Sequence, residues 1–264
     1  MTEALTIANP AGERRREGAP SAPPVLEPRA HGPAAALARR LDGRHPAAVY
    51  LAALVAGYVL LVAVVIGVGL LLVHAILPAA GIGSADEHVN EVLARHRSAN
   101  LNDATYVGSM IGDVPTIPAL VTLAVLVAAV LRRWRVAAFV LGAILVEVST
   151  YRLASLIVHR ERPTVPRLDH LPVNQSYPSG HVAASVAVYA GLALLLASVT
   201  RRTALAAAGW TLAVVLVAIV AFSRMDRGMH HPIDAAAGAL IGVASVCIAV
   251  LAARAAGAAA ERRR

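Results

Sequence analysis

The sequence predicts an all-α membrane protein built as a bundle of six transmembrane helices. Hydrophobic residues make up 58% of its 264 residues and the mean hydropathy is +0.64, a composition too apolar for most soluble proteins. Six nearly uninterrupted runs of Ala, Val, Leu and Ile recur along the chain, and runs of about 18 or more apolar residues are typical of helices that cross a bilayer. Only 4% of the residues are aromatic, so we expect the helices to pack through small and branched side chains.

The apolar runs divide the chain into three parts. Residues 1–46 are rich in Pro, Ala, Arg and Glu and show no sustained apolar period, which predicts a disordered cytoplasmic tail. Residues 47–254 form the predicted transmembrane domain, and residues 255–264 form a basic cytoplasmic C-terminus. The six spans are predicted at 47–73, 114–131 (alternatively from Tyr106), 136–158, 182–199, 204–222 and 233–253.

A polar stretch, residues 84–103, separates the first two spans. Glu91 and Arg95 are four residues apart there, a spacing that supports an ion pair along one helix face, so we expect a short interfacial helix. Asp113 lies near the start of the second span and is expected to sit at the membrane interface.

The placement of arginines predicts the orientation, because positive charge beside a span holds a loop on the cytoplasmic side. Both termini are then cytoplasmic in a multi-pass protein of the plasma (inner) membrane, and the loops after the third and fifth spans face outside. The net charge of +8 does not indicate nucleic-acid binding, because no basic face alternates with aromatic residues. The arginines assigned to the inside are Arg39, Arg40, Arg44, Arg132, Arg133, Arg135, Arg201, Arg202, Arg262, Arg263 and Arg264.

Three short polar stretches interrupt the apolar pattern, and all three fall on the predicted outer face. They are residues 159–163 (HRERP), 177–181 (YPSGH) and 223–234 (SRMDRGMHHPID). Arg162 and Arg224 offer planar forks of N–H donors that match phosphate oxygens. The stretches therefore indicate an anion site at the outer ends of the spans.

The second stretch opens the fourth span. Ser179 suits the N-cap of that helix, so the backbone N–H groups near Gly180 and His181 would point at a bound anion. Glycine lets the backbone approach a ligand closely. The imidazole of His181 can donate a proton to a leaving oxygen.

The third stretch places His230 and Asp234 four residues apart, and Pro232 between them suits the first turn of the sixth span. A carboxylate bonded to one imidazole nitrogen fixes the tautomer that leaves the other nitrogen nucleophilic. His231 is adjacent, so chemistry alone leaves the choice between the two histidines open.

Together the stretches resemble the signature motifs of the type-2 phosphatidic acid phosphatase family, the lipid phosphate phosphatases related to vanadium haloperoxidases. The family pattern is Lys-x6-Arg-Pro, then Pro-Ser-Gly-His, then Ser-Arg-x5-His-x3-Asp. Residues 162–163, 178–181 and 223–234 supply all of it except the lysine. The six-span layout extends the similarity over the predicted transmembrane domain.

The resemblance implies a role for each matched residue. His230 would attack phosphorus with Asp234 orienting it, while His181 would protonate the leaving group and later activate water. The resemblance thus favours His230 over His231 as the nucleophile. The residues expected to hold the phosphate are Arg162, Ser179, Gly180 and Arg224.

One position departs from the family pattern. The lysine falls on Ser155, which removes a phosphate-binding charge. We expect Arg152, one helical turn deeper in the third span, to supply that charge, with Arg160 as the competitor because it lies nearer the site. Alternatively, Arg152 forms an ion pair with Glu147, an ionisable residue within the same span. Glu147 could instead form a hydrogen bond with a neighbouring helix.

The sequence therefore predicts an integral membrane lipid phosphatase that works through a phosphohistidine. We expect no metal or other cofactor, because no cluster of carboxylates and histidines has metal-ligand spacing and the arginines can stabilise the charge. Expected partners are the bilayer and a lipid phosphate, which is polyprenyl diphosphate, phosphatidate or phosphatidylglycerophosphate. The predicted outward-facing site favours polyprenyl diphosphate. Two alternatives stand beside it. Ser155 suggests a catalytically impaired lipid-phosphate-binding protein of the same fold, and Glu147 suggests a transporter.

The orientation can be tested by cysteine labelling in a Cys247→Ser background. We expect a membrane-impermeant thiol reagent to label Arg167→Cys in intact cells, because the loop after the third span faces outside. Arg133→Cys, in a cytoplasmic loop, should be labelled only after the cells are opened. The reverse pattern would turn the three polar stretches toward the cytoplasm.

Overall fold

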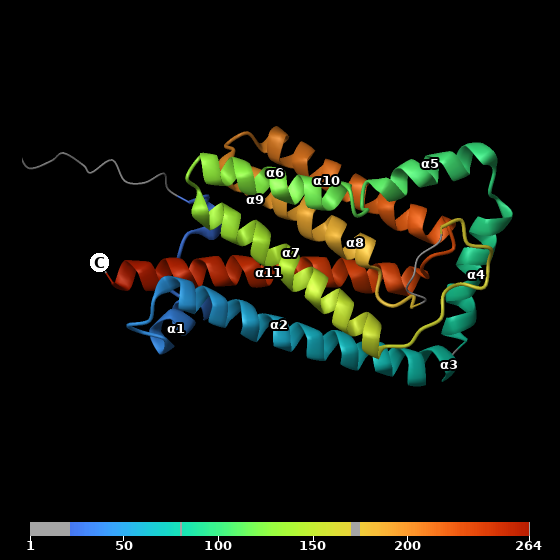
Figure 1. Ribbon diagram of the computed structural model, residues 1–264, viewed down its shortest axis with the longest axis horizontal. Helices are drawn as coiled ribbons and strands as arrows, with labels where there is room; N and C mark the ends of the chain where they lie inside the picture. The colour runs from blue at the N-terminus through green and yellow to red at the C-terminus, as the bar shows by residue number, and fades with distance from the viewer. Residues whose placement is uncertain (1–21, 80, 170–174, 264) are drawn as a thin grey trace, which may run out of the picture.

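The computed structural model describes residues 22–79, 81–169 and 175–263, and this part of the chain is helical without strands, as predicted (Figure 1). Five helices within it are long and apolar enough to cross a membrane. Three of these spans are single helices: α7 (Trp134–Ile157), α10 (Thr203–Asp226) and α11 (Pro232–Arg262). A fourth consists of α2 (Pro46–Leu71), a π-helical turn, η2 (Leu72–Ile76), and α3 (Leu77–Ala79). The fifth consists of α8 (Gly180–Ser185), a second π-helical turn, η3 (Val186–Ala190), and α9 (Gly191–Val199).

The second predicted span, 114–131, is shorter than expected. It is α6 (Thr116–Val130), an apolar helix of 15 residues that packs beside α7. Tyr106, the alternative start, lies instead in a separate helix, α5 (Ala99–Met110). The two helices cannot merge because Asp113 folds its carboxylate back onto the backbone N–H of Val114, at 2.7 Å, and the following proline lacks an N–H for a continuous helix.

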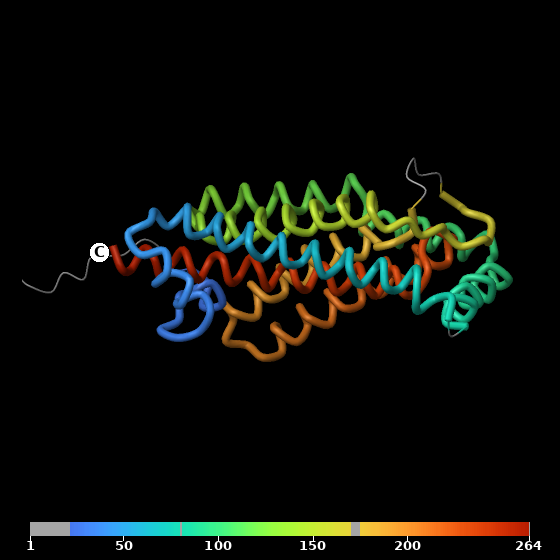
Figure 2. Tube along the Cα trace, turned by 90° about the horizontal axis from the view of Figure 1, so that it is seen from below, coloured from blue at the N-terminus to red at the C-terminus, as the bar shows by residue number. Residues whose placement is uncertain are grey.

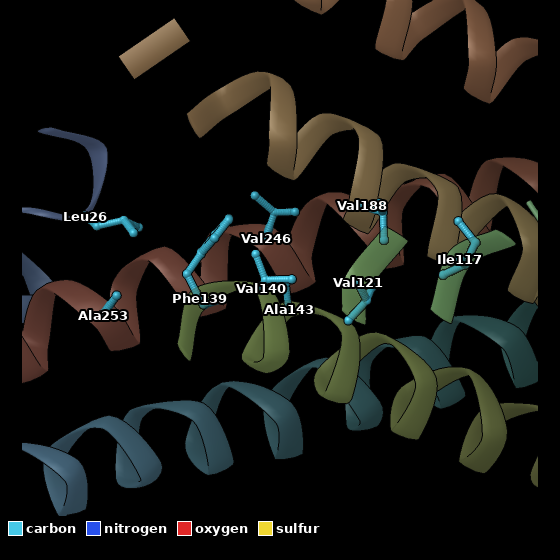
Figure 3. Packing of buried hydrophobic residues seen from close by; sticks show 10 residues of the cluster. Leu26, Ile117, Val121, Phe139, Val140, Ala143, Val188, Val246 and Ala253 are labelled. Atoms are coloured by element: carbon cyan, nitrogen blue, oxygen red, sulfur yellow. The ribbon is translucent and has the colours of Figure 1, made fainter. Parts of the chain in front are cut away.

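The predicted disordered tail is wrong for residues 22–46, whereas residues 1–21 lie outside the described part. This stretch forms a 3-10 turn, η1 (Pro24–Leu26), and a helix, α1 (Pro33–Arg40), that packs on α11. Leu26 is 0% exposed, and Figure 3 shows it beside Ala253 at the end of a row of buried side chains. The order arises because α11 continues to Arg262, past the predicted end of the sixth span at residue 253, and gives the stretch an apolar surface to cover.

A short helix was predicted within residues 84–103, and α4 (Ile82–Arg95) confirms it. The predicted pair of Glu91 and Arg95 lies on its exposed side, with 3.9 Å between Oε2 and Nη2. Helices α3 to α5 cover one end of the bundle, where the chain also passes from α7 to α8 and from α10 to α11 (Figures 1 and 2). We call this the motif end, because the three polar stretches lie there.

Helix α11 runs through the middle of the bundle in both views and packs against α1, α2, α7 and α8. Two of its glycines let α8 approach closely. A Cβ atom on Gly238 would lie 2.3 Å from the carbonyl oxygen of Ser179, and one on Gly242 would lie 2.6 Å from that of Ala183. Small residues four apart are a common means of close packing between membrane helices. The start of α8 is therefore seated directly on the start of α11.

Candidate active site

The three polar stretches meet at the motif end. The backbone N–H of Ser179 donates to the carbonyl oxygen of Asp234 at 3.0 Å, and the N–H of Ser176 donates to the carbonyl oxygen of Arg160 at 2.8 Å. Arg162 donates from Nη1 to the carbonyl oxygen of Met229. The loop after α7, the start of α8 and the α10–α11 turn thus form a single unit.

Asp234 is the point at which these segments join. It is the third residue of α11, and its Oδ2 accepts from the backbone N–H of His231, the N-cap residue, at 2.9 Å. The same oxygen accepts from Oγ of Ser176 at 2.5 Å, and Oδ1 accepts from Nη1 of Arg160 at 2.5 Å. A carboxylate in the first turn of a helix also interacts favourably with the helix dipole.

The predicted contact between Asp234 and His230 is replaced by another one. Nδ1 of His230 lies 2.7 Å from the carbonyl oxygen of Ser176, whereas Asp234 contacts Nδ1 of His231 at 3.2 Å. The four-residue spacing would align the two side chains only inside a helix, but His230 precedes the N-cap of α11. Because a carbonyl can only accept, Nδ1 of His230 carries the proton and Nε2 keeps its lone pair.

The surroundings of His230 favour a neutral imidazole. Its side chain is 3% exposed. Burial, together with the positive charges of Arg224 and Arg162, holds the pKa of His230 well below its ordinary value. The ring is therefore neutral at physiological pH, which is the state in which Nε2 can attack an electrophile.

His231 is in a different position. Its Nδ1 contacts Asp234, and its Nε2 lies 2.9 Å from Oε2 of Glu87, on α4. Hydrogen bonds from Thr164 and His231 lower the pKa of Glu87, although its partial burial acts in the opposite direction. Both ring nitrogens of His231 are therefore occupied by carboxylates, a distinction between the two histidines that spacing alone did not provide.

Arg224 presents one edge of its guanidinium group without a partner. It is 2% exposed, and its Nη1 donates to Oγ of Ser109 and to Oδ2 of Asp169, both at 2.8 Å. Among the described residues, nothing accepts from its buried Nε and Nη2. These two N–H groups form one side of the planar fork that matches two oxygens of a phosphate.

Ser179 and Gly180 lie at the start of α8. Ser179 is the N-cap residue, as predicted, but its side chain makes no capping bond, and its buried Oγ has no partner in the described part of the chain. At Gly180 a Cβ atom would lie 2.9 Å from the ring of Tyr151. The glycine is thus required for packing against Tyr151 as well as suited to a ligand.

A cavity of about 380 Å³ opens next to these residues. Burial lowers the pKa of Arg162 to about 10, so this arginine on the cavity wall stays charged at neutral pH. The cavity is lined by Gly112, Asp113, Val114, Ile117, Pro118, Glu147, Val148, Tyr151, Arg152, Arg162, Gly180, His181 and Ala184.

His181 has a partner that the sequence analysis missed. Its Nε2 lies 3.3 Å from Oδ1 of Asp113, in the α5–α6 turn, which was expected only to sit at the interface. The hydrogen bond with His181 is the main reason that the pKa of Asp113 falls to about 2, so this residue is a carboxylate. The signal in the sequence was an acidic residue just before a proline inside an apolar run.

The residues around the missing lysine are arranged as follows. Ser155 donates from Oγ to the carbonyl oxygen of Arg152 at 2.9 Å, and Arg152 lies on the cavity wall with an exposed side chain. Arg160 is buried between Asp234 and Asp86, whose Oδ2 lies 2.5 Å from its Nη2, so it is already neutralised. Glu147 is buried on the same wall, and its Oε2 has no partner among the described residues.

Comparison with known proteins shows which family this part of the chain resembles. Residues 135–257 match the family described as the PAP2 superfamily. An undecaprenyl-diphosphatase of Sulfolobus acidocaldarius is 34% identical over 107 residues, which are 40% of this chain and 48% of that protein, so the match spans about half of the relative's length.

Two solved structures are similar in fold. A transmembrane PAP2-type phosphatidylglycerolphosphate phosphatase from Bacillus subtilis aligns with a TM-score of 0.60 at 20% identity, over 77% of this chain and 93% of that one. LpxE of Aquifex aeolicus aligns with a TM-score of 0.47 at 20% identity, over 61% of this chain and 92% of that one. Residues 135–257 of this chain thus match a PAP2 superfamily domain, and the fold is similar to that of a PAP2-type phosphatase.

Proposed function

We propose that this protein is an integral membrane lipid phosphatase that cleaves a phosphomonoester or a diphosphate through a phosphohistidine intermediate. The observation that supports this most directly is the pairing of two groups in one buried site. His230 is a neutral imidazole with its Nδ1 proton engaged, and two N–H donors of Arg224 have no acceptor among the residues that the structure describes. A nucleophile next to an oxyanion-binding fork is what phosphoryl transfer requires.

The reaction proceeds in two displacements. Nε2 of His230 attacks phosphorus while the bond from phosphorus to the leaving oxygen breaks, and His181 gives its proton to that oxygen. His181 then takes a proton from water, whose oxygen attacks phosphorus and breaks the phosphorus–nitrogen bond. Inorganic phosphate leaves and both histidines return to their starting states. The equatorial oxygens are held throughout by Arg162, Ser179, Gly180 and Arg224.

The charges that stabilise the transferred phosphoryl group come from arginines, so we propose that the reaction is independent of metal ions. Arg162 and Arg224 are both buried at the site, where a fixed positive charge acts more strongly than in water. Their planar donors can follow the three equatorial oxygens as the bond to the leaving group breaks.

The shape and lining of the cavity support an amphipathic substrate. Two arginines, Arg152 and Arg162, and the imidazole of His181 lie on its wall together with apolar side chains such as Ile117 and Val148. A phosphate group joined to a hydrocarbon chain fits this combination. The relative named as an undecaprenyl-diphosphatase and an outward-facing site in the plasma membrane both favour a polyprenyl diphosphate over a glycerophospholipid.

The nucleophile is tested by comparing the two adjacent histidines. We expect His230→Ala to abolish phosphate release from a lipid diphosphate in detergent, because the variant lacks the Nε2 that attacks phosphorus. His231→Ala should keep a substantial fraction of the activity. An acid-labile phosphate should be trapped on the wild-type protein and be absent from His230→Ala. Full activity of His230→Ala would rule out the phosphohistidine mechanism.

Metal independence is tested with the purified enzyme. Activity should survive a strong chelator, because Arg162 and Arg224 supply the positive charge. Vanadate should inhibit, since it adopts the five-coordinate geometry of phosphoryl transfer at His230. Complete loss of activity in the chelator, restored by magnesium, would contradict the proposal.

The role of Arg152 is tested by moving the charge along the helix. We expect Arg152→Ala to lower kcat/KM by roughly tenfold or more, the scale of one lost charged hydrogen bond, and Arg152→Ala combined with Ser155→Lys to recover much of it. Arg95→Ala, at an exposed site on α4, controls for general loss of positive charge. Wild-type kcat/KM in Arg152→Ala would show that the phosphate is held without it.

A further inference from the structure

Helix α4 lies outside the family domain, yet one of its side chains binds the backbone of the proposed nucleophile. Asn90 is 0% exposed, and its Nδ2 donates two hydrogen bonds. One goes to the carbonyl oxygen of Met225 and the other to that of His230, both at 3.0 Å. A single amide group thus joins the end of α10 to the residue just before α11.

Two more residues on the same face of α4 contact the neighbours of His230. Glu87 accepts from Nε2 of His231 at 2.9 Å, and Asp86 accepts from the backbone N–H of Ile233 at 3.2 Å. Asp86, Glu87 and Asn90 are spaced three and four apart, which puts them on one side of the helix. Helix α4 therefore contacts the α10–α11 turn at His230 and on its C-terminal side.

We propose that α4 is a positioning element for catalysis and that Asn90 is the residue through which it fixes His230, a role that rests on the proposed function. His230 is held at three points. Ser176 accepts from Nδ1, the backbone N–H donates to the carbonyl oxygen of Arg224 at 3.3 Å, and Asn90 binds the backbone carbonyl. Without Asn90 the carbonyl side of His230 loses its anchor, and the residue can shift because the turn before it contains Gly228 in the left-handed region, at φ 71°, and is not part of a helix.

The expected effect follows from the geometry of the attack. Nε2 must lie in line with the bond that breaks, and a displacement of about 1 Å can cost on the order of 100-fold in rate. Of the proposed phosphate ligands, Arg162 and Ser179 lie outside the segment that Asn90 binds. Arg224 precedes Met225, but its guanidinium group is held by Ser109 and Asp169. Loss of the amide should therefore lower kcat and leave phosphate binding intact.

The experiment uses two substitutions in the full-length protein. Asn90→Asp keeps the size of the side chain but removes both N–H donors, and Asn90→Ala removes the whole contact. We expect kcat for a lipid diphosphate to fall roughly 10- to 100-fold in both. KM should stay within about threefold of wild type, because Asn90 positions the nucleophile and does not bind the phosphate. The dissociation constant for inorganic phosphate, measured by calorimetry, should also stay within about threefold for the same reason. Glu91→Gln, one residue further along on the exposed face, should match wild type.

Each remaining outcome decides against the proposal. Wild-type kcat in both Asn90 variants would overturn it. So would a parallel loss of kcat, phosphate affinity and thermal stability, since α4 would then be only structural. Failure of the proposed function is distinguishable, because it would appear as activity in His230→Ala whatever the Asn90 variants do.

Discussion

The structure of the site depends on one buried carboxylate. Asp234 is completely buried, and an ionised carboxylate in such a place is costly unless charges and hydrogen bonds surround it. Its partners come from all three polar stretches or their flanks: Arg160 after α7, Ser176 before α8, and His231 at the start of α11. Moving any of the three segments away would leave the buried carboxylate without one of its hydrogen-bond partners. The burial of Asp234 therefore holds the segments together.

The two histidines of the proposed reaction differ in their partners, and the difference matches their roles. His230 faces a neutral carbonyl oxygen and two arginines, which favour the uncharged ring of a nucleophile. His181 faces the carboxylate of Asp113, which can accompany a ring that gains and loses a proton. Environments that separate two titratable groups in this way are a general means of assigning acid and nucleophile within one site. The hydrogen-bond partners, Ser176 for His230 and Asp113 for His181, both lie outside the motif that contains the histidine.

Local patterns in the sequence predicted the helices, because apolar runs mark the spans. They also predicted that the motifs meet, because loops separated by an even number of spans lie on the same side of the membrane. The contacts that escaped prediction depend on pairs far apart in the chain. Asn90 and His230 are separated by 140 positions, and Asp113 and His181 by 68. The assumed pairing of His230 with Asp234 failed because the helix begins only after His230. The packing of residues 22–46 escaped prediction because it rests on a few scattered apolar residues, Leu26 in one buried cluster and Ala34 and Ala38 in another.

The shortness of α6 has a consequence for the lipid around it. Fifteen residues span about 22 Å, less than the roughly 30 Å of a hydrocarbon core. A bilayer adapts to such a mismatch by thinning locally, at a cost of a fraction of a kcal/mol per Å. Thinning beside α6 would lower the headgroup layer at the motif end toward the turn that contains Asp113, which lines the cavity. The proposed lipid substrate would then bring its phosphate to the cavity by lateral diffusion, with its hydrocarbon chain still in the membrane.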